Sequence, residues 1–284
     1  MELPIDFKMP LSEKEYQLFA RFIYDYCGID LGDNKKELMK ARLMKRVRIL
    51  KLKSYRDYYE YVLNDKSGTE LVEMLDSVST NVTHFFRERQ HFDFMHHRIL
   101  PDLVRVKTAA RNCQIRVWSC AASSGEEIYT ILMTLLEFLP SALDWDVRVL
   151  GTDISSRVLA SAKEGIYLPD RMKDVPQIYQ EKYFTKEYED KRFFFRVKDV
   201  LRARAVFARL NLMDGVFPFK GKFDLIFCRN VMIYFDKPTQ ECLVNKLSRY
   251  LAPGGHLFIG HSESLIGLRT DFHSVAPAVF RKPL

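Results

Sequence analysis

Small residues and carboxylates follow the first strongly hydrophobic strand pattern of the chain. Residues 117–127 (VWSCAASSGEE) predict a buried strand, a loop of small residues and the start of a helix. Small side chains let a ligand approach the backbone at the carboxyl end of a strand, where open α/β sheets bind their ligands. A phosphate loop of the GxxxxGK[ST] type would instead bring a lysine and a glycine-rich turn. Glu126 and Glu127 therefore favour a ligand that offers hydroxyl groups or a cation, unless they only stabilise the helix N-terminus.

A second acid follows the next strand pattern, VLGTDIS, at Asp153. In doubly wound sheets the second strand commonly ends in an acid that hydrogen-bonds a ribose, roughly 20 residues beyond the first loop. Asp153 alone is equally consistent with the N-cap of the helix predicted after it. Combined with the small-residue loop, it favours an adenosine-type ligand without phosphates, and S-adenosylmethionine is the commonest cofactor of this kind.

The elements that position these residues fall into two parts. Amphipathic helix patterns fill the first ~105 residues, beginning with a capping box at Ser12 and Glu15, and short β-rich runs then alternate with helices, which is typical of βαβ units around a parallel sheet. We predict a helical N-terminal domain over 1–106, a linker over 107–114 and an α/β domain over 115–284. The segment from about 165 to 204 breaks the alternation and predicts an inserted antiparallel β-subdomain.

Composition restricts the class of protein. The 284 residues are 47% hydrophobic and 29% charged, which is ordinary for a globular protein. No run approaches the length of a membrane span and no basic-then-apolar leader begins the chain, so we expect a cytoplasmic protein. The five cysteines show no CxxC spacing and therefore signal neither a zinc site nor a disulfide framework.

The positive charge is concentrated in one predicted helix. Residues 34–53 carry nine Lys or Arg against one Glu, a net charge of +8, so the rest of the chain contributes about −1 to the total of +7. Asp33 or Asn34 is the expected cap of this helix, and Met39, Leu43, Val47 and Leu50 form its predicted buried face. The basic side chains form either a solvated helix face or a docking surface for a polyanion or an acidic helix.

Several motifs together resemble the CheR family of chemotaxis receptor methyltransferases. They are TNVTHFFR (80–87), WSCAASSGEE (118–127), Asp153, the pair Asn211 and Leu212, FCRNVMIYFD (227–236) and GGHLFIGHSE (254–263). The similarity runs in order over nearly the whole chain. It implies a helical N-terminal domain joined to a Rossmann-like methyltransferase domain with a seven-stranded, mostly parallel sheet and a small β-subdomain, which agrees with the pattern of elements.

The resemblance also implies a cofactor site for S-adenosylmethionine and no metal. For individual residues other roles stay open: Asn81 and Thr83 can brace the interdomain turn, Asn211 can simply end a strand, and Arg87 can pair with Glu88 or Glu126. The implied cofactor contacts are Asn81, Thr83, Arg87, Ala121, Glu127, Asp153, Asn211, Leu212, Cys228 and Arg229.

The substrate implied by the resemblance is a glutamate side chain on a chemoreceptor helix, and the products are the glutamate 5-O-methyl ester and S-adenosylhomocysteine. A carboxylate is already ionised at pH 7, which explains why no catalytic His or Cys constellation stands out. By resemblance Tyr234 reaches the transfer site and Arg87 orients the glutamate, since an Arg fork fixes the plane of a carboxylate. The alternative for Tyr234 is a core aromatic.

The basic helix then has an expected partner in the acidic methylation helices of the receptor. The predicted docking residues are Lys35, Arg42, Lys45, Arg46, Arg48 and Lys53. The loop 185–191 (TKEYEDK) contains no glycine, unlike the loop associated with family members that bind a receptor pentapeptide tether, so we expect no dependence on a tether. We also expect a monomer.

Two other classes of protein remain as alternatives. A nucleic-acid methyltransferase fits the basic helix, but it would usually carry an N/D-P-P-Y type motif after the fourth strand, where Cys228–Val231 (CRNV) stands instead. A non-catalytic S-adenosylmethionine-binding signalling module is the other.

Overall fold

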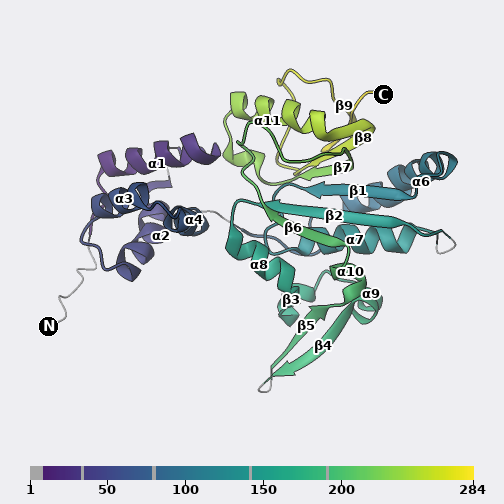
Figure 1. The fold of residues 1–284 in the computed structure, drawn as a ribbon, viewed down its shortest axis with the longest axis horizontal. Coiled ribbons are helices and arrows are strands. Elements are labelled where there is room, and N and C mark those ends of the chain that lie inside the picture. Colours follow the sequence, from purple (N-terminus) through teal and green to yellow (C-terminus); the bar gives the residue numbers. More distant parts are fainter. Residues whose placement is uncertain (1–8, 33–34, 79–80, 141–142, 190–191) are drawn as a thin grey trace.

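Four helices form the N-terminal domain of the computed structural model, which describes residues 9–32, 35–78, 81–140, 143–189 and 192–284 (Figure 1). They are α1 (Glu13–Cys27), α2 (Lys36–Ile49), α3 (Tyr55–Asn64) and α4 (Thr69–Val78). The capping box of Ser12 with Glu15 is present, and the chain leaves α1 at Gly28 with a φ of 73°, a conformation that glycine adopts without strain. The cap expected at residue 33 or 34 lies outside the described residues.

The helical domain has its own hydrophobic core. Met39, Leu43 and Val47 of α2 are buried in it, as their spacing predicts, and Leu50 packs at its edge. Phe19 of α1 lies in the same core, which gathers residues from all four helices. The basic face of α2 is therefore carried on the outside of a packed unit.

Seven strands form the main sheet, in the order β6-β2-β1-β7-β8-β10-β9. The first five pair in parallel and the last two are antiparallel, which confirms the predicted fold class. The strands are β1 (Gln114–Ser119), β2 (Asp146–Asp153), β6 (Ala205–Arg209), β7 (Phe223–Cys228), β8 (Leu251–Ile259), β9 (His273–Ala276) and β10 (Val279–Arg281).

Helices cover both faces of this sheet, and alternate strand residues enter different cores. Leu225 and Phe227 of β7 pack in the core that includes α7 (Glu126–Phe138), whereas Ile226 packs in the core beneath α11 (Lys237–Tyr250). Side chains of a strand alternate between the faces of its sheet, so the continuous apolar run of β7 fills both cores. Within the described residues no helix is long and apolar enough to cross a membrane.

The division between the two parts differs from the predicted boundary at residue 106. The helical stretch of α5 (Gln90–Phe94), η2 (Met95–Ile99) and α6 (Leu100–Ala109) packs through Phe92, Met95 and Ile99 into the core of the sheet, not into that of α1–α4. Lys107 to Ala109 are helical and β1 begins at Gln114, so half of the predicted linker belongs to regular elements. Helical periodicity identifies a buried face but not the core that receives it.

The predicted insertion forms a small second sheet with strand order β3-β5-β4. Its elements are β3 (Ile166–Tyr167), η3 (Pro169–Met172), α9 (Gln177–Tyr183), β4 (Phe184–Glu189), β5 (Arg192–Val197) and α10 (Asp199–Arg202), and β4 and β5 project away from the main sheet (Figure 1). Its base is tied to the first loop, because Tyr167 donates a hydrogen bond of 2.7 Å to the carbonyl of Ser124. Helix α8 (Ser156–Glu164) precedes it and contacts β2 and β6.

Candidate active site

A pocket opens at the carboxyl ends of β1 and β2, between the sheet and the helical domain. It lies where the strand order reverses direction around β1, the place where open α/β sheets bind ligands. Ten of the predicted catalytic and cofactor residues line it: Asn81, Thr83, Arg87, Ala121, Glu127, Asp153, Asn211, Leu212, Arg229 and Tyr234.

Asp153 is held at the floor of this pocket with its carboxylate partly satisfied by backbone groups. Its Oδ2 accepts the N–H of Ser123 at 2.9 Å and its Oδ1 accepts that of Ser155 at 3.0 Å. Burial raises the pKa of Asp153, opposed by these two N–H donors. Ser155, not Asp153, caps α8, so the N-cap alternative for Asp153 is wrong.

The two acids of the first loop have different environments. Glu127 lines the pocket, and Ser119 donates to it at 2.7 Å. Glu126 is fully buried beneath the loop, where Ser124 donates to it at 2.7 Å and Arg171 lies 3.5 Å away. Only Glu127 is therefore placed to contact a ligand, and Glu126 stabilises the loop.

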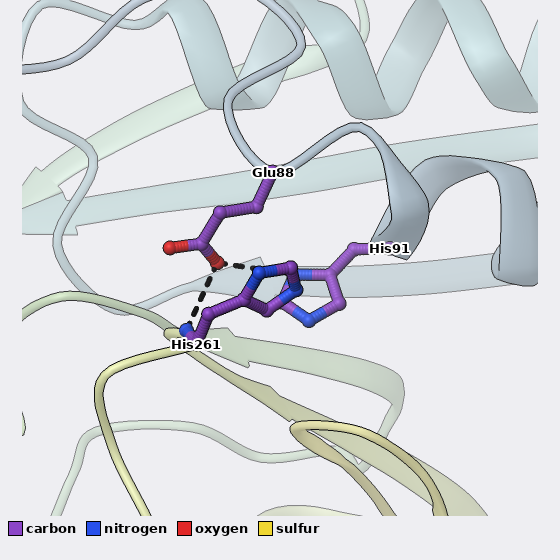
Figure 2. A group of neighbouring side chains, drawn as sticks. All are labelled: Glu88, His91 and His261. Atoms are coloured by element: carbon purple, nitrogen blue, oxygen red, sulfur yellow. Dashed lines mark hydrogen bonds and ion pairs between the residues drawn. The ribbon is translucent and has the colours of Figure 1, made fainter.

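Glu88, which directly follows Arg87, links three segments that are far apart in the sequence: its own, the one that carries Arg229 and the one that carries His261. Its carboxylate lies 3.5 Å from Nδ1 of His91 and accepts the backbone N–H of His261 at 3.2 Å (Figure 2). Burial alone would raise the pKa of Glu88, but the charge of Arg229 and several hydrogen bonds lower it below its usual value. Glu88 is consequently an ionised anchor at the back of the pocket.

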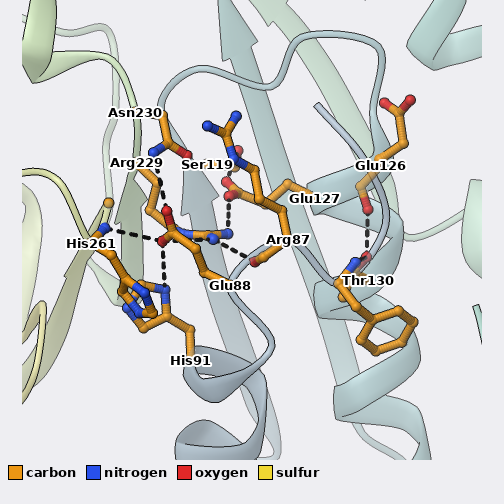
Figure 3. A network of polar contacts seen from close by, with 12 residues as sticks. Arg87, Glu88, His91, Ser119, Glu126, Glu127, Thr130, Arg229, Asn230 and His261 are labelled. Atoms are coloured by element: carbon orange, nitrogen blue, oxygen red, sulfur yellow. Dashed lines mark hydrogen bonds and ion pairs between the residues drawn. The ribbon is translucent and has the colours of Figure 1, made fainter. Parts of the chain in front are cut away.

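Arg229 crosses the centre of this network (Figure 3). Its guanidinium donates to Glu127 at 2.7 Å, to Glu88 at 3.1 Å and to the carbonyl of Arg87 at 2.5 Å, and its side chain is only 2% exposed. Two carboxylates compensate the buried charge, as buried ions require. Arg229 thus fixes the backbone of Arg87 against the start of α7.

Both residues of the predicted catalytic pair, Arg87 and Tyr234, line the pocket. Arg87 donates from Nη1 to the carbonyl of Val82 at 2.7 Å, and within the described residues it forms neither of the expected alternative ion pairs, with Glu88 or Glu126. Tyr234 ends the short helix η4 (Met232–Tyr234) and is only partly buried. Its carbonyl accepts the N–H of Asp30 at 2.7 Å, so Tyr234 stands where the two domains meet.

Three of the predicted cofactor residues also hold the domains together. The Asn211 side chain donates to the carbonyl of Tyr26 at 2.6 Å. The carbonyl of Asn81 accepts the hydroxyl of Ser123 at 3.2 Å, and that of Thr83 accepts Arg171 at 2.7 Å. The bracing role left open for Asn81 and Thr83 is therefore present, alongside their position in the pocket wall, whereas Asn211 lies two residues beyond the end of β6 and does not end that strand.

Cys228 is the one predicted cofactor residue outside the pocket lining. It is fully buried at the end of β7 and packs in the core beneath α11. Its side chain points to the α11 face of the sheet, because it follows Phe227 by one residue and successive side chains of a strand point to opposite faces. A contact through its side chain is therefore not supported, and the neighbouring Arg229 reaches the pocket instead.

The predicted docking residues divide into four groups. Lys35 and Arg42 line the pocket, Lys45 and Lys53 are exposed, and Arg48 is half-buried. Arg46 is different, because it pairs with Glu70 at 2.6 Å and Glu73 at 2.9 Å with only 14% of its side chain exposed. The prediction of Arg46 as a docking residue is wrong: helical spacing placed it on the basic stripe but not beside the acids of α4.

Sequence reasoning missed the residues that shape the loops around the pocket. Glu263, from the GHSE motif, accepts the backbone N–H groups of Asn230 at 3.0 Å and Ile233 at 3.2 Å, which positions the loop bearing Tyr234. Gly260 is needed there, since a Cβ would lie 2.5 Å from the side chain of Asn230. Glu263 lies in one of the quoted motifs, but the sequence alone does not indicate which distant residues its carboxylate contacts.

The pocket fits an adenosine-type cofactor. The buried Asp153 carboxylate uses one acceptor position per oxygen on the backbone, which leaves lone pairs for hydroxyl donors. Ala121 and Cys120 present small side chains beside it, and Glu127 supplies a carboxylate suited to a cationic group. The residues that would hold S-adenosylmethionine are therefore present together.

The topology, the small-residue loop and Asp153 define a Rossmann-like domain that binds a nucleoside cofactor. The chain belongs to the CheR methyltransferase family: the CheR methyltransferase SAM-binding domain matches residues 81–280 and its all-alpha domain matches residues 14–79. The family domains meet near residue 80, as the two hydrophobic cores do. The predicted S-adenosylmethionine-dependent methyltransferase class and its cofactor are confirmed.

Relatives match over nearly their full length. The chain is 41% identical over 273 residues to a chemotaxis protein methyltransferase of Borreliella burgdorferi, covering 96% of this chain and 95% of the relative. It is 40% identical over 246 residues to a probable chemotaxis protein methyltransferase of Rhizobium etli, covering 86% and 90%. It is 36% identical over 266 residues to the chemotaxis protein methyltransferase of Escherichia coli, covering 93% and 88%.

Proposed function

We propose that this protein transfers the methyl group of S-adenosylmethionine to glutamate side chains on chemoreceptor helices. The observation that carries the proposal is that Asp153, Arg87 and Tyr234 line one pocket, whose lining also includes the basic residues Lys35 and Arg42. The names of the relatives, chemotaxis protein methyltransferases, support a chemoreceptor as the substrate.

Methyl transfer to a carboxylate requires no general base from the protein's own side chains. Bound S-adenosylmethionine supplies a methyl group that its sulfonium activates. A glutamate with an ordinary pKa of about 4.3 is ionised at pH 7 and needs no general base. The protein's task is to align and desolvate this carboxylate, an effect that can contribute ~7–11 kcal/mol.

Each side chain then has one task in that alignment. Asp153 holds the ribose hydroxyls, and Glu127 faces the cationic part of the cofactor. Arg87 uses Nη1 on the Val82 carbonyl, and its remaining N–H groups orient the glutamate. Tyr234 closes the opposite side. Orientation, not activation, is the role of Arg87, because tight pairing would weaken the nucleophile.

Receptor docking involves the exposed part of the basic helix. Lys35 and Arg42 line the pocket, with Lys45 and Lys53 exposed on the same domain. Complementary charge of this kind mainly accelerates association. We further propose that the protein acts as a monomer in the cytoplasm, without nucleic acid and without a receptor pentapeptide tether.

The test uses radiolabelled S-adenosylmethionine with either receptor membranes or nucleic acid. We expect base-labile methyl ester in the membranes, and Arg87→Ala and Tyr234→Phe should lower its rate of formation. Arg89→Ala is the matched control, because Arg89 is exposed two residues away and its ion pair among the described residues, with Asp93, is a distant one at 3.9 Å. Label in nucleic acid, or in neither substrate, would refute the proposal. Wild-type rates in both variants would refute the assignment of Arg87 and Tyr234.

A further inference from the structure

Glu88, His91 and His261 bring one carboxylate and two imidazoles together behind the pocket (Figure 2). One ligand atom from each lies within 4.8 Å of those of the others. We propose that these three side chains form a binding site for a divalent transition-metal ion of the zinc class. Two histidines with one carboxylate are a ligand set that Zn²⁺ takes in proteins, with a fourth position left to water.

His91 is the observation that points to a ligand. Its side chain is 1% exposed, and neither ring nitrogen has a hydrogen-bond partner within the described residues. A buried polar group without a partner costs about 1–3 kcal/mol, so the site is incomplete as it stands.

The distances suit a tetrahedral ion after a small adjustment. Ligands held 2.0–2.1 Å from a tetrahedral centre lie about 3.4 Å apart, and Nδ1 of His91 is 3.5 Å from Oε2 of Glu88. The ring of His261 is exposed, and its centroid lies 4.6 Å from that of His91. Rotation of the exposed ring closes the remaining gap, and the same exposure gives the ion its access from solvent.

The nearby positive charge of Arg229 is already compensated. Arg229 pairs with both Glu88 and Glu127, so these three groups together carry a negative charge and favour a cation. An ion on Glu88 competes with Arg229 for the carboxylate. Since Arg229 also holds the carbonyl of Arg87, occupancy of the metal site should weaken cofactor binding.

The test titrates the full-length, untagged, metal-free chain with Co²⁺, whose visible absorption reports tetrahedral nitrogen and oxygen ligation, and with Zn²⁺ by calorimetry. We expect one ion per chain. His261→Ala removes an exposed ring and leaves the backbone bond to Glu88 intact, so the fold should persist, as circular dichroism can check. Loss of a direct ligand should weaken binding at least as much as loss of an outer-shell partner, by about tenfold or more.

His97→Ala is the matched control. His97 is an exposed histidine on the same helical stretch, with its ring 4.8 Å from that of His96, so this pair is the competing place for an adventitious ion. Unchanged affinity in His97→Ala together with weakened affinity in His261→Ala supports the site. The absence of a Co²⁺ band, an unchanged affinity in His261→Ala, or a loss confined to His97→Ala would each overturn the proposal.

Discussion

Replacing Asp153 with Asn tests the cofactor site with a change of very few atoms. The carboxylate accepts a backbone N–H on each oxygen, from Ser123 and from Ser155. An amide keeps the shape but exchanges one acceptor for a donor. One of the two N–H groups then faces an N–H, and the pocket loses the negative charge that we assign to the ribose hydroxyls.

The size of the effect follows from those contacts. A hydrogen bond to a charged group contributes about 1.5–3 kcal/mol, and a buried donor without an acceptor costs a similar amount. We expect a loss of about 3 kcal/mol in binding, which is about 100-fold in Kd. Burial raises the pKa of Asp153, which means that the folded state disfavours the charge, so removal of the charge offsets part of the cost of the N–H group left without an acceptor and the variant should remain folded.

Calorimetry with S-adenosylhomocysteine measures the change directly. Asp144→Asn is the control, because Asp144 is exposed just before β2, at the other end of the strand that Asp153 terminates. If Asp153→Asn is folded and binds within about threefold of the wild type, Asp153 is not the ribose acceptor.

Three further predictions concern stability and docking. Arg46→Glu should destabilise the protein by about 3–5 kcal/mol in urea denaturation, since it leaves the buried Glu70 unpaired, whereas Lys45→Glu should stay within about 0.5 kcal/mol. Burial and the charge of Arg281 lower the pKa of His256 to about 4. Below pH 6.5 the unfolded chain therefore binds a proton that the folded chain does not. The contribution of His256 to the free energy of unfolding is fully present above pH 6.5 and should fall towards pH 4 by up to about 1.4 kcal/mol per pH unit. A His256→Gln variant that lost stability just as steeply would contradict this. The rate of methylation of receptor membranes should fall severalfold as the salt concentration rises, because exposed charges are screened over about 8–10 Å. The fall should be smaller in Lys45→Glu. Rates that do not change with salt would exclude electrostatic docking.

Local sequence rules predicted most of the fold because each rule describes a contact between neighbours. The capping box at Ser12 joins residues three apart, and the buried face of α2 follows from helical periodicity alone. Asp153 was identifiable because strand, loop and acid occur at a regular spacing in this class of sheet. These features needed no knowledge of distant residues.

The predictions that failed depend on partners that the local pattern does not contain. Arg46 belongs to the basic stripe by spacing, yet Glu70, 24 residues later, takes it into the domain. The helical stretch after residue 90 has a clear apolar face, but only the tertiary fold decides that the sheet receives it. A surface assigned from charge pattern alone is therefore reliable only where the structure leaves the side chains exposed, as at Lys45 and Lys53.

The segment from residue 81 to 89 shows why the site itself needs long-range contacts. Its backbone carbonyls are held by Ser123, Arg171 and Arg229, which come from the first loop, the β-subdomain and the end of β7. This segment carries Arg87 and joins the helical domain to the sheet. If a receptor helix docks on α2, as we propose, it meets a pocket wall already fixed from three sides, so the position of Arg87 does not depend on the docking contact.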